Sequence, residues 1–368
     1  MKVLIQMGNV GDSIIDHLIS PIARVEDVDE IMLVVRKPGP QIENIKYYCP
    51  PKCLRTIPGI AIIFEFFILI TLSLCKNPGY IGGYLFFPHG LLAYIVAKIT
   101  RKPIVIVLIA GPVELYSIAS PVIYNPSKDL KLYGKCMLAI LKSSNAIVTT
   151  GSFTKDFLVK HGVSSYKVFP VISCPNADRF YPTNETKVFD VIFVGRLAQV
   201  KNVETVLLSI KEANKIIPNI KAIIIGDGPL RNQLKEMLPE LGIESNIQFL
   251  GYKKDVHVYL NKSRVLILTS KREGFPNVYL EALFCGLPAV VSNCGDITDI
   301  AKDGYNSYVV EDPADYKAFS GAISELLTNE DLYQRIARNV KDTVDRLSSY
   351  DNSIAWKNVI NTAMKKQS

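Results

Sequence analysis

Short runs rich in β-branched residues alternate with helical segments along most of the chain. This alternation predicts βαβ units, in which crossover helices join parallel strands. Both halves of the 368-residue chain carry such runs. We expect strands at residues 3–7, 31–35, 84–87, 104–108 and 146–149 in the first half, and at residues 191–194, 222–225, 247–250, 265–268, 289–292 and 307–310 in the second. The sequence therefore predicts an α/β protein with two doubly wound, Rossmann-like domains and a cleft between them.

A chain of this length suffices for two domains of ordinary size. Residues 174–184, which separate the two sets of strands, are rich in turn-forming residues and are typical of a linker. We expect the first domain over residues 1–180 and the second over residues 185–345. Residues 346–368 hold the only tryptophan, Trp356, and we expect them to form a final helix that can cross back to the first domain.

Charge and cysteine usage narrow the class of protein. The formal net charge is +7, and the Lys and Arg residues are dispersed and not clustered with aromatics. That pattern disfavours nucleic acid as a partner and is compatible with an anionic substrate or membrane surface. The seven cysteines include no CxxC pair, which favours a reduced protein over a disulfide framework or a zinc site. We expect a cytoplasmic location without a cleaved signal peptide, and the inner face of the membrane is the alternative.

One segment, residues 57–75, is almost wholly apolar and approaches the length of a membrane span. Glu65 at its centre and the pair Pro58-Gly59 argue against spanning. Its place between two predicted strands also requires a crossover helix. We therefore expect a buried or half-buried helix, and a face that contacts a membrane surface or a lipid acceptor is the alternative.

Two glutamates eight residues apart frame the start of a predicted helix in the second half. Glu273 ends a loop, Gly274 and Pro276 open the helix, and Glu281 lies just over one turn inside it. We expect Gly286 to end the helix. Free backbone N–H groups and the positive end of the helix dipole lie between the two carboxylates. This arrangement suits a ligand with both hydroxyls and phosphates, such as a nucleotide sugar.

Three further motifs follow predicted strands of the second half, at the edge of a parallel sheet where ligands bind. Arg196 and Lys201 suit a diphosphate, although a solvated loop is the alternative. Asp227 can cap a tight strand-to-helix turn. Tyr252 lies where backbone can contact a nucleobase. The motifs are Gly195-Arg196 with Lys201, Gly226-Asp227-Gly228-Pro229, and Leu250-Gly251-Tyr252.

In combination, these motifs resemble the nucleotide-sugar-binding domain of the retaining glycosyltransferases of family 4, over residues 191–310. The resemblance implies the GT-B fold, with an acceptor-binding first domain. It also implies that Arg196 and Lys201 hold the diphosphate, Glu281 binds ribose and Glu273 contacts the donor sugar. The implied donor-binding set is Gly8, Gly11, Gly195, Arg196, Lys201, Gly226, Gly251, Tyr252, Glu273, Gly274, Phe275, Pro276, Asn277, Val278 and Glu281.

The first half matches this family less closely. Gly8 and Gly11 correspond to the family's glycine loop that closes on the pyrophosphate, and an ordinary strand-to-helix turn is the alternative. Many family members carry a histidine where this chain has Ala110. His89 and Glu114 are candidates to replace it, and a structural histidine is the alternative for His89.

The resemblance implies a retaining glycosyltransferase that moves a sugar from a nucleotide-diphosphate donor to a glycan, a lipid-linked saccharide or a small molecule. We expect Glu273, Arg196, Lys201 and His89 to act in catalysis, without a metal or a further cofactor. Two cations and a helix N-terminus can stabilise the charge that develops on the leaving diphosphate. A UDP-sugar is expected before a GDP-sugar, because UDP is common in this family.

Three other functions stay open at this point. Ala110 in place of a histidine is compatible with a non-catalytic sugar-nucleotide-binding subunit that needs a partner. A GT-B sugar-nucleotide epimerase would share the fold and the nucleotide site. A dinucleotide-dependent oxidoreductase is disfavoured, because Gly8-Asn9-Val10-Gly11 lacks the G-x-G-x-x-G spacing.

Overall fold

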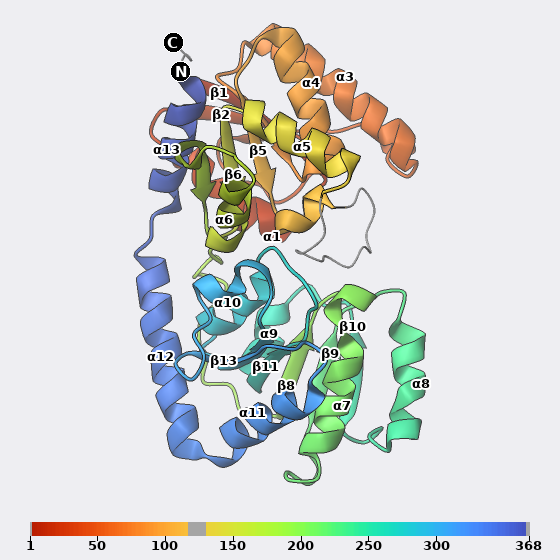
Figure 1. The fold of residues 1–368 in the computed structure, drawn as a ribbon. Coiled ribbons are helices and arrows are strands. Elements are labelled where there is room, and N and C mark those ends of the chain that lie inside the picture. The colour runs from red at the N-terminus through yellow and green to blue at the C-terminus, as the bar shows by residue number, and fades with distance from the viewer. Residues whose placement is uncertain (1, 117–129, 366–368) are drawn as a thin grey trace. The chain divides into compact units, whose positions relative to one another are not determined.

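The computed structural model of the chain describes residues 2–116 and 130–365. The chain divides into two compact units (Figure 1). Unit 1 comprises residues 1–173 and 351–368, and unit 2 comprises residues 174–350. The last helix, α13 (Asn352–Met364), therefore belongs to unit 1. Each unit is built on its own parallel sheet.

The sheet of unit 1 has seven parallel strands in the order β3-β2-β1-β4-β5-β6-β7. Its order reverses between β1 and β4, which makes it a doubly wound sheet. The edge strands β3 and β7 are short and were missing from the prediction. The strands are β1 (Lys2–Met7), β2 (Val28–Val34), β3 (Ile45–Tyr48), β4 (Ile81–Tyr84), β5 (Ile104–Leu108), β6 (Ala146–Thr149) and β7 (Val168–Pro170).

The strand predicted at residues 84–87 was placed three residues too late. β4 ends at Tyr84, Leu85 turns with φ +60°, and Phe86–Gly90 forms a helical turn. The prediction failed because glycines usually mark breaks in a strand. Here Gly83 lies inside β4 because a Cβ at this position would come within 2.5 Å of Gly90 Cα.

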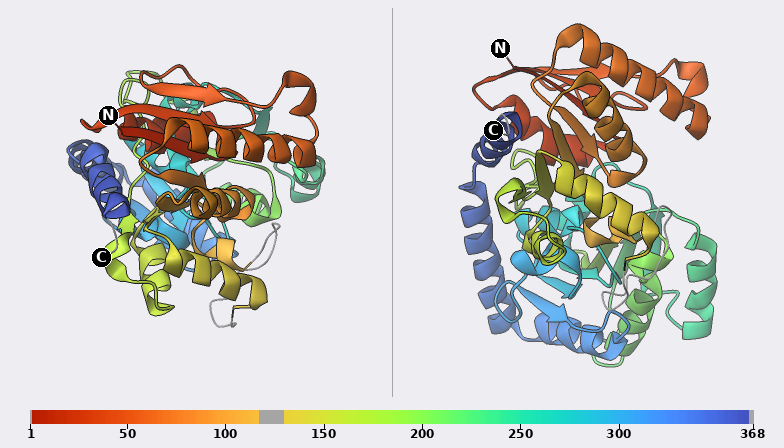
Figure 2. Two further views of the ribbon diagram at one scale, coloured as in Figure 1. Left: turned by 90° about the horizontal axis from the view of Figure 1, so that it is seen from above. Right: turned by 45° about the horizontal axis from the view of Figure 1, so that its top comes forward.

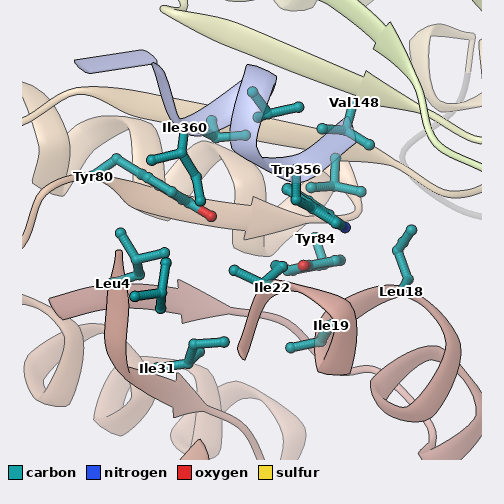
Figure 3. Packing of buried hydrophobic residues seen from close by; sticks show 14 of the residues in the cluster. Leu4, Leu18, Ile19, Ile22, Ile31, Tyr80, Tyr84, Val148, Trp356 and Ile360 are labelled. Carbon is teal, nitrogen blue, oxygen red and sulfur yellow. The ribbon is translucent and has the colours of Figure 1, made fainter. Parts of the chain in front are cut away.

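Helices cover both faces of this sheet (Figure 2). Successive strand side chains point to opposite faces, so Leu4 and Ile5 of β1 belong to different cores. On one face Trp356 and Ile360 of α13 point into the core (Figure 3). The helices of unit 1 are α1 (Asp12–Ile14), α2 (Ser20–Ala23), α3 (Pro58–Lys76), α4 (Leu91–Thr100), α5 (Leu132–Ser143), α6 (Ser152–Lys160) and α13.

The apolar segment at residues 57–75 forms helix α3, which joins β3 to β4 and packs beside α4 (Figure 1). The prediction of a crossover helix is confirmed, but four of its nineteen residues are buried, fewer than the buried or half-buried helix that we expected: Ala61, Glu65, Leu69 and Ser73. Among the described residues, α3 is the one helix whose length and composition would suffice to cross a membrane.

The sheet of unit 2 has six parallel strands in the order β10-β9-β8-β11-β12-β13. All six were predicted, with boundaries that differ by two residues or fewer. The strands are β8 (Phe189–Val194), β9 (Ala222–Ile225), β10 (Ile247–Gly251), β11 (Ser263–Leu268), β12 (Ala289–Ser292) and β13 (Ser307–Val310). The helices are α7 (Val203–Ala213), α8 (Arg231–Leu241), α9 (Val256–Asn261), α10 (Asn277–Phe284), α11 (Tyr316–Thr328) and α12 (Glu330–Ser348).

The segment at residues 174–184 is packed on unit 2 and is not a free linker. Asn261 of α9 accepts a hydrogen bond from the Thr183 N–H (2.8 Å) and donates one to the Tyr181 carbonyl (3.0 Å). Phe180 is buried, and its ring lies edge-on to His257. The chain therefore leaves unit 1 after Ser173, before the turn-rich residues begin.

Candidate functional site

Most of the predicted donor-binding residues of unit 2 gather at the topological switch point of its sheet. β8 and β11 are neighbours, whereas β9 and β12 lie on opposite sides of this pair. Open α/β sheets bind ligands at such a point, outside the carboxyl ends of the strands. Gly195, Arg196 and Lys201 follow β8, and Glu273 follows β11. The fold thus brings together residues that lie more than seventy positions apart in the sequence.

An ion pair between Glu273 and Lys201 links the two loops. Oε1 of Glu273 accepts hydrogen bonds from Lys201 Nζ and from Ser270 Oγ, the latter at 2.7 Å. The two charged side chains retain 16% and 20% of their exposure, so solvent reaches the pair. Within residues 2–116 and 130–365, no hydrogen bond to Oε2 of Glu273 is seen. That oxygen is therefore available to a ligand hydroxyl.

Backbone and hydroxyl contacts fix the position of this pair. Thr269 Oγ1 donates to the carbonyls of Lys201 (3.0 Å) and Asn202 (2.9 Å). The Lys271 N–H donates to the Val200 carbonyl at 2.9 Å. These bonds join the loop after β11 to the backbone carbonyls of the loop after β8. The prediction did not include Thr269 or Ser270, although both lie within four residues of Glu273.

A third loop, after β12, supports Glu273 from its backbone side. Gly295 has φ +62°, and a Cβ there would lie 2.1 Å from the Glu273 carbonyl oxygen. The next residue, Asp296, donates its N–H to the Gly274 carbonyl at 2.8 Å. Only glycine fits such an approach at a positive φ. Gly295 was also missed, because a glycine after a strand is common and its neighbour in space, Glu273, lies 22 positions earlier in the sequence.

Helix α10 presents an uncapped N-terminus close to Glu273. It begins at Asn277, with Pro276 as the N-cap residue in an extended conformation, and no side chain caps it. The predicted start is therefore one residue early. Glu281 is the fifth residue of α10 and lies one turn beyond Asn277 on the same face. Gly286 ends the helix with φ +75°, as predicted.

The Gly226-Asp227-Gly228 turn supports the loop that carries Arg196. A Cβ on Gly226 would lie 1.8 Å from the Gly195 carbonyl oxygen, and one on Gly228 would lie 2.4 Å from that of Leu197. The Leu197 N–H also donates to the Asp227 carbonyl at 2.9 Å. Asp227 Oδ1 accepts from the Gly228 N–H (2.8 Å), which is the local turn cap that we expected. Packing within the protein thus accounts for both glycines.

Arg196 and Tyr252 are members of the predicted set whose side chains are exposed. Arg196 is exposed, and within the described residues its guanidinium forms no hydrogen bond or ion pair. Tyr252 is 77% exposed. It follows Gly251, whose carbonyl accepts from the Gly226 N–H at 2.9 Å. Both side chains are therefore free to meet a ligand. In the described parts of the chain, no cluster of three or more His, Cys, Asp or Glu residues is placed to hold a metal ion.

In unit 1, the predicted glycines follow β1 at the corresponding switch point. A Cβ on Gly8 would lie 2.8 Å from Tyr84 Cβ, so close packing of β1 against β4 requires glycine there. Gly11 precedes α1, and no heavy atom lies within 4 Å of a Cβ built on it. Packing thus explains Gly8 and leaves Gly11 open to a ligand.

His89 lies inside unit 1. It is 4% exposed, and its Nε2 lies 3.2 Å from Oε2 of Glu65, which is 1% exposed. Arg36 approaches the other oxygen of Glu65 at 3.5 Å. This cluster explains the charged residue in the middle of an apolar helix. Its burial argues against the catalytic role that we predicted for His89 and supports the structural alternative.

Glu114, the other candidate for the missing histidine, is held by backbone donors. Its oxygens accept from the N–H groups of Phe86 (2.6 Å) and Ala110 (2.7 Å), in the loops after β4 and β5. Burial raises the pKa of Glu114 to about 7, although these hydrogen bonds act in the opposite direction. Glu114 therefore positions the backbone at Ala110.

Sequence comparison relates unit 2 to known enzymes. Residues 176–343 match the family described as glycosyl transferases group 1. A capsular polysaccharide biosynthesis glycosyltransferase, CapM of Staphylococcus aureus, is 25% identical over 75% of this chain and 75% of its own. The 2-deoxystreptamine N-acetyl-D-glucosaminyltransferase of Niallia circulans is 25% identical over 65% of this chain and 61% of its own length. An uncharacterized glycosyltransferase of Methanocaldococcus jannaschii, MJ1059, is 36% identical, but the match spans only 26% of that protein.

Solved structures of the same fold cover the whole chain. HepE of Anabaena, crystallised with UDP and glucose, superposes with a TM-score of 0.76 at 15% identity, over 99% of this chain and 100% of its own. Sucrose-phosphate synthase of Thermosynechococcus elongatus gives a TM-score of 0.74 at 18% identity, over 98% of both chains. Together with the two parallel sheets, these similarities confirm the predicted GT-B fold class.

Proposed function

We propose that this protein is a retaining glycosyltransferase that uses a nucleotide-diphosphate sugar, because residues 176–343 match the family of glycosyl transferases group 1. The observation that carries the proposal is the Lys201–Glu273 pair at the β8–β11 switch point. Glu273 lies four residues before the first residue of α10, whose N-terminus is uncapped. Positive charge and hydroxyl acceptors then lie together, as a diphosphate linked to a sugar requires.

In the proposed reaction, Arg196, Lys201 and the N-terminus of α10 bind the diphosphate. Cleavage of the glycosidic bond builds negative charge on the leaving nucleotide and positive charge on the sugar. Fixed cations and backbone N–H groups stabilise the first charge as it develops. We propose that they do so without a metal ion.

The two glutamates would bind the rest of the donor. Glu281, one turn inside α10, is proposed to accept from the ribose hydroxyls. Glu273 is proposed to accept from a sugar hydroxyl through Oε2, while Oε1 stays bound to Ser270. Lys201 would then divide its hydrogen bonds between Glu273 and a phosphate oxygen, since an ammonium group has three donors.

A UDP-sugar is the donor that we propose, supported by the UDP and UDP-glucose in the HepE structures. The test is a thermal-shift series with UDP-, GDP- and ADP-sugars, followed by an assay for release of the nucleotide. We expect the UDP-sugar to raise the melting temperature most and to be turned over. If none of the three raised the melting temperature, the donor site would be wrongly assigned.

A second function is favoured by two features of unit 1. Ala110 stands where the family resemblance leads us to expect a histidine, and His89 is buried against Glu65. A sugar-nucleotide-binding subunit without catalytic activity of its own would tolerate both features. Donor hydrolysis or transfer by the purified chain alone would exclude this alternative. Donor binding without turnover would favour it.

We also propose an acceptor class and a location for the protein. A glycan, a lipid-linked saccharide or a small molecule would fit the activity. CapM, which acts in polysaccharide biosynthesis, supports the first of these. Seven cysteines without a disulfide, among the described residues, are compatible with the cytoplasmic location that we propose.

A further inference from the structure

Helix α3 of unit 1 exposes apolar side chains to solvent and buries its charged one, whereas an ordinary surface helix does the reverse. Its only charge between Pro58 and Cys75 is Glu65, which points inward and is 1% exposed. The buried residues recur every four positions and define one narrow stripe. The opposite, solvent-facing side carries exposed apolar side chains. These are Ile60, Ile63, Phe64, Phe67 and Leu74, of which Phe67 is 58% and Leu74 67% exposed.

Helix α4 extends this apolar face. It packs beside α3, and its Ile95 and Ile99 are 38% and 58% exposed. A surface helix normally exposes its polar side, so neighbouring apolar stripes on two helices indicate a partner surface. We call the seven exposed residues of α3 and α4 the α3–α4 face.

The charged residues in the sequence segment that contains α3 and α4 are almost all basic. Between Glu43 and Glu114 the sequence has one acidic residue, the buried Glu65, and seven basic residues. One of these, Lys46, pairs with Glu30. Within the described structure the other six form no salt bridge: Lys52, Arg55, Lys76, Lys98, Arg101 and Lys102.

These cations lie at both ends of the face. Lys52 and Arg55 precede α3, whereas Lys76 ends it and Arg101 follows α4. Lys76, Arg101 and Lys102 also line a pocket of about 530 Å³ at this second end. An exposed apolar strip between groups of cations has the composition of a helix that lies in the interface of an anionic bilayer.

From these observations we propose that unit 1 docks on an anionic phospholipid bilayer through the α3–α4 face, with lipid phosphates at Lys76 and Arg101. The helix lies in the plane of the membrane and does not span it. Spanning would pull Ala61 and Leu69 out of the core and would break the ion pairs of Glu65. A second copy of the chain fits this face less well, because pairing two such faces would bring the cations of both copies together.

The orientation links the membrane to the proposed function. Glu65 pairs with Arg36 and His89, which follow β2 and β4, so the first half of α3 lies near the carboxyl edge of the sheet. Docking along α3 therefore holds that edge close to the lipid surface. If the chain is a glycosyltransferase as proposed, its acceptor is then membrane-anchored. The docking itself does not depend on the activity.

Co-sedimentation of the full chain with vesicles tests the proposal. One set of vesicles is phosphatidylcholine alone, and the other also contains phosphatidylglycerol. We expect the protein to bind the anionic set more tightly. Phe67→Asp should weaken this binding about tenfold or more, since it replaces an inserted ring by an anion. The control Ile354→Asp, at a residue of similar exposure (61%) on α13, should bind like the wild type.

A charge variant tests the second element of the proposal. Lys76→Gln with Arg101→Gln should weaken binding to anionic vesicles about fivefold per cation and should leave binding to phosphatidylcholine unchanged. Equal binding of the wild type and Phe67→Asp, or no binding of the wild type to either set, would overturn the proposal. So would a dimer in the absence of lipid that Phe67→Asp converts to a monomer.

Thermal shift with UDP-sugars on the same proteins separates the two proposals. Phe67 lies in unit 1 and Glu273 in unit 2. The expected result for Phe67→Asp is therefore loss of vesicle binding with an unchanged shift of the melting temperature by the donor. A wild type that responds to the donor and ignores the vesicles would refute the docking alone.

Discussion

At the scale of single residues, Gly295 is the position where the candidate site depends most on backbone packing. Gly295→Ala should destabilise unit 2 by about 2–4 kcal/mol, because a Cβ would lie 2.1 Å from the Glu273 carbonyl oxygen at a positive φ. Gly304→Ala is the matched control. Gly304 also has a positive φ, but nothing lies within 4 Å of its Cβ position. We expect Gly304→Ala to cost about 1 kcal/mol.

Urea unfolding of the two variants, followed by far-UV circular dichroism, measures this difference. Gly295→Ala should also weaken donor binding, since the displaced carbonyl belongs to Glu273. Equal midpoints for the two alanine variants would show that the loop after β12 adapts freely and does not hold Glu273 in place.

Glu281 carries the proposed contact with ribose. Glu281→Ala should weaken the affinity for a UDP-sugar by about tenfold to a hundredfold, the cost of losing hydrogen bonds to a charged acceptor. Glu236→Ala, which removes an exposed carboxylate from α8 of the same unit, is the control. Isothermal titration gives both affinities. An unchanged affinity in Glu281→Ala, with unchanged turnover, would remove Glu281 from the site.

Sequence reasoning found the charged residues of the candidate site and missed those that position them. Glu273, Lys201 and Arg196 were predicted because carboxylates and cations at strand ends have a direct chemical meaning. Ser270 and Gly295 act through a hydroxyl and a close backbone approach, and their partners follow from the order of the strands. Such contacts become predictable only when the spatial neighbours of each loop are known.

At the scale of elements, Glu114 ties the loop after β4 to the loop after β5. Its pKa in the folded chain is raised from 4.5 to about 7. Folding therefore favours the protonated form. The contribution to stability is fully present below pH 4.5 and is lost as the pH rises through about 7. The change over this window is about 3 kcal/mol.

Glu114→Gln tests this dependence, because an amide cannot ionise. Unfolding free energies from urea titrations should fall with rising pH more steeply in the wild type than in the variant, over the interval from pH 4.5 to 7. Parallel pH profiles would show that Glu114 does not titrate in this range. This holds also where Glu114→Gln lowers the free energy of unfolding by the same amount at every pH.

The same scale shows why some elements were predicted well. With the exception of β4, the central strands of both units are apolar runs bounded by turns, and they were found close to their observed limits. β4 was shifted, because its Gly83 serves a close contact with Gly90 and Ala93 that no local pattern reveals. Glu65 gave the sequence prediction a charge inside an apolar segment but not its partners, because Arg36 and His89 follow the distant strands β2 and β4.

At the scale of the whole molecule, the single tryptophan makes it possible to follow the unfolding of one unit apart from that of the other. Trp356 is fully buried in the core of unit 1, so its fluorescence reports the unfolding of that unit. The proposed donor contacts lie mainly in unit 2. A UDP-sugar at a hundred times its dissociation constant should stabilise the binding unit by about 2.7 kcal/mol.

We therefore expect the donor to raise the melting temperature seen by circular dichroism by about 5–10 °C, and that seen by tryptophan emission much less. The reason is that a multidomain chain need not unfold in one step, and a ligand stabilises only the unit that binds it. Parallel thermal scans with both probes, with and without donor, measure the difference. Trp356→Phe, which keeps an aromatic ring in the core, is the control for the probe. If both probes moved by the same amount, the two units would unfold together, and the donor would stabilise the chain as a whole.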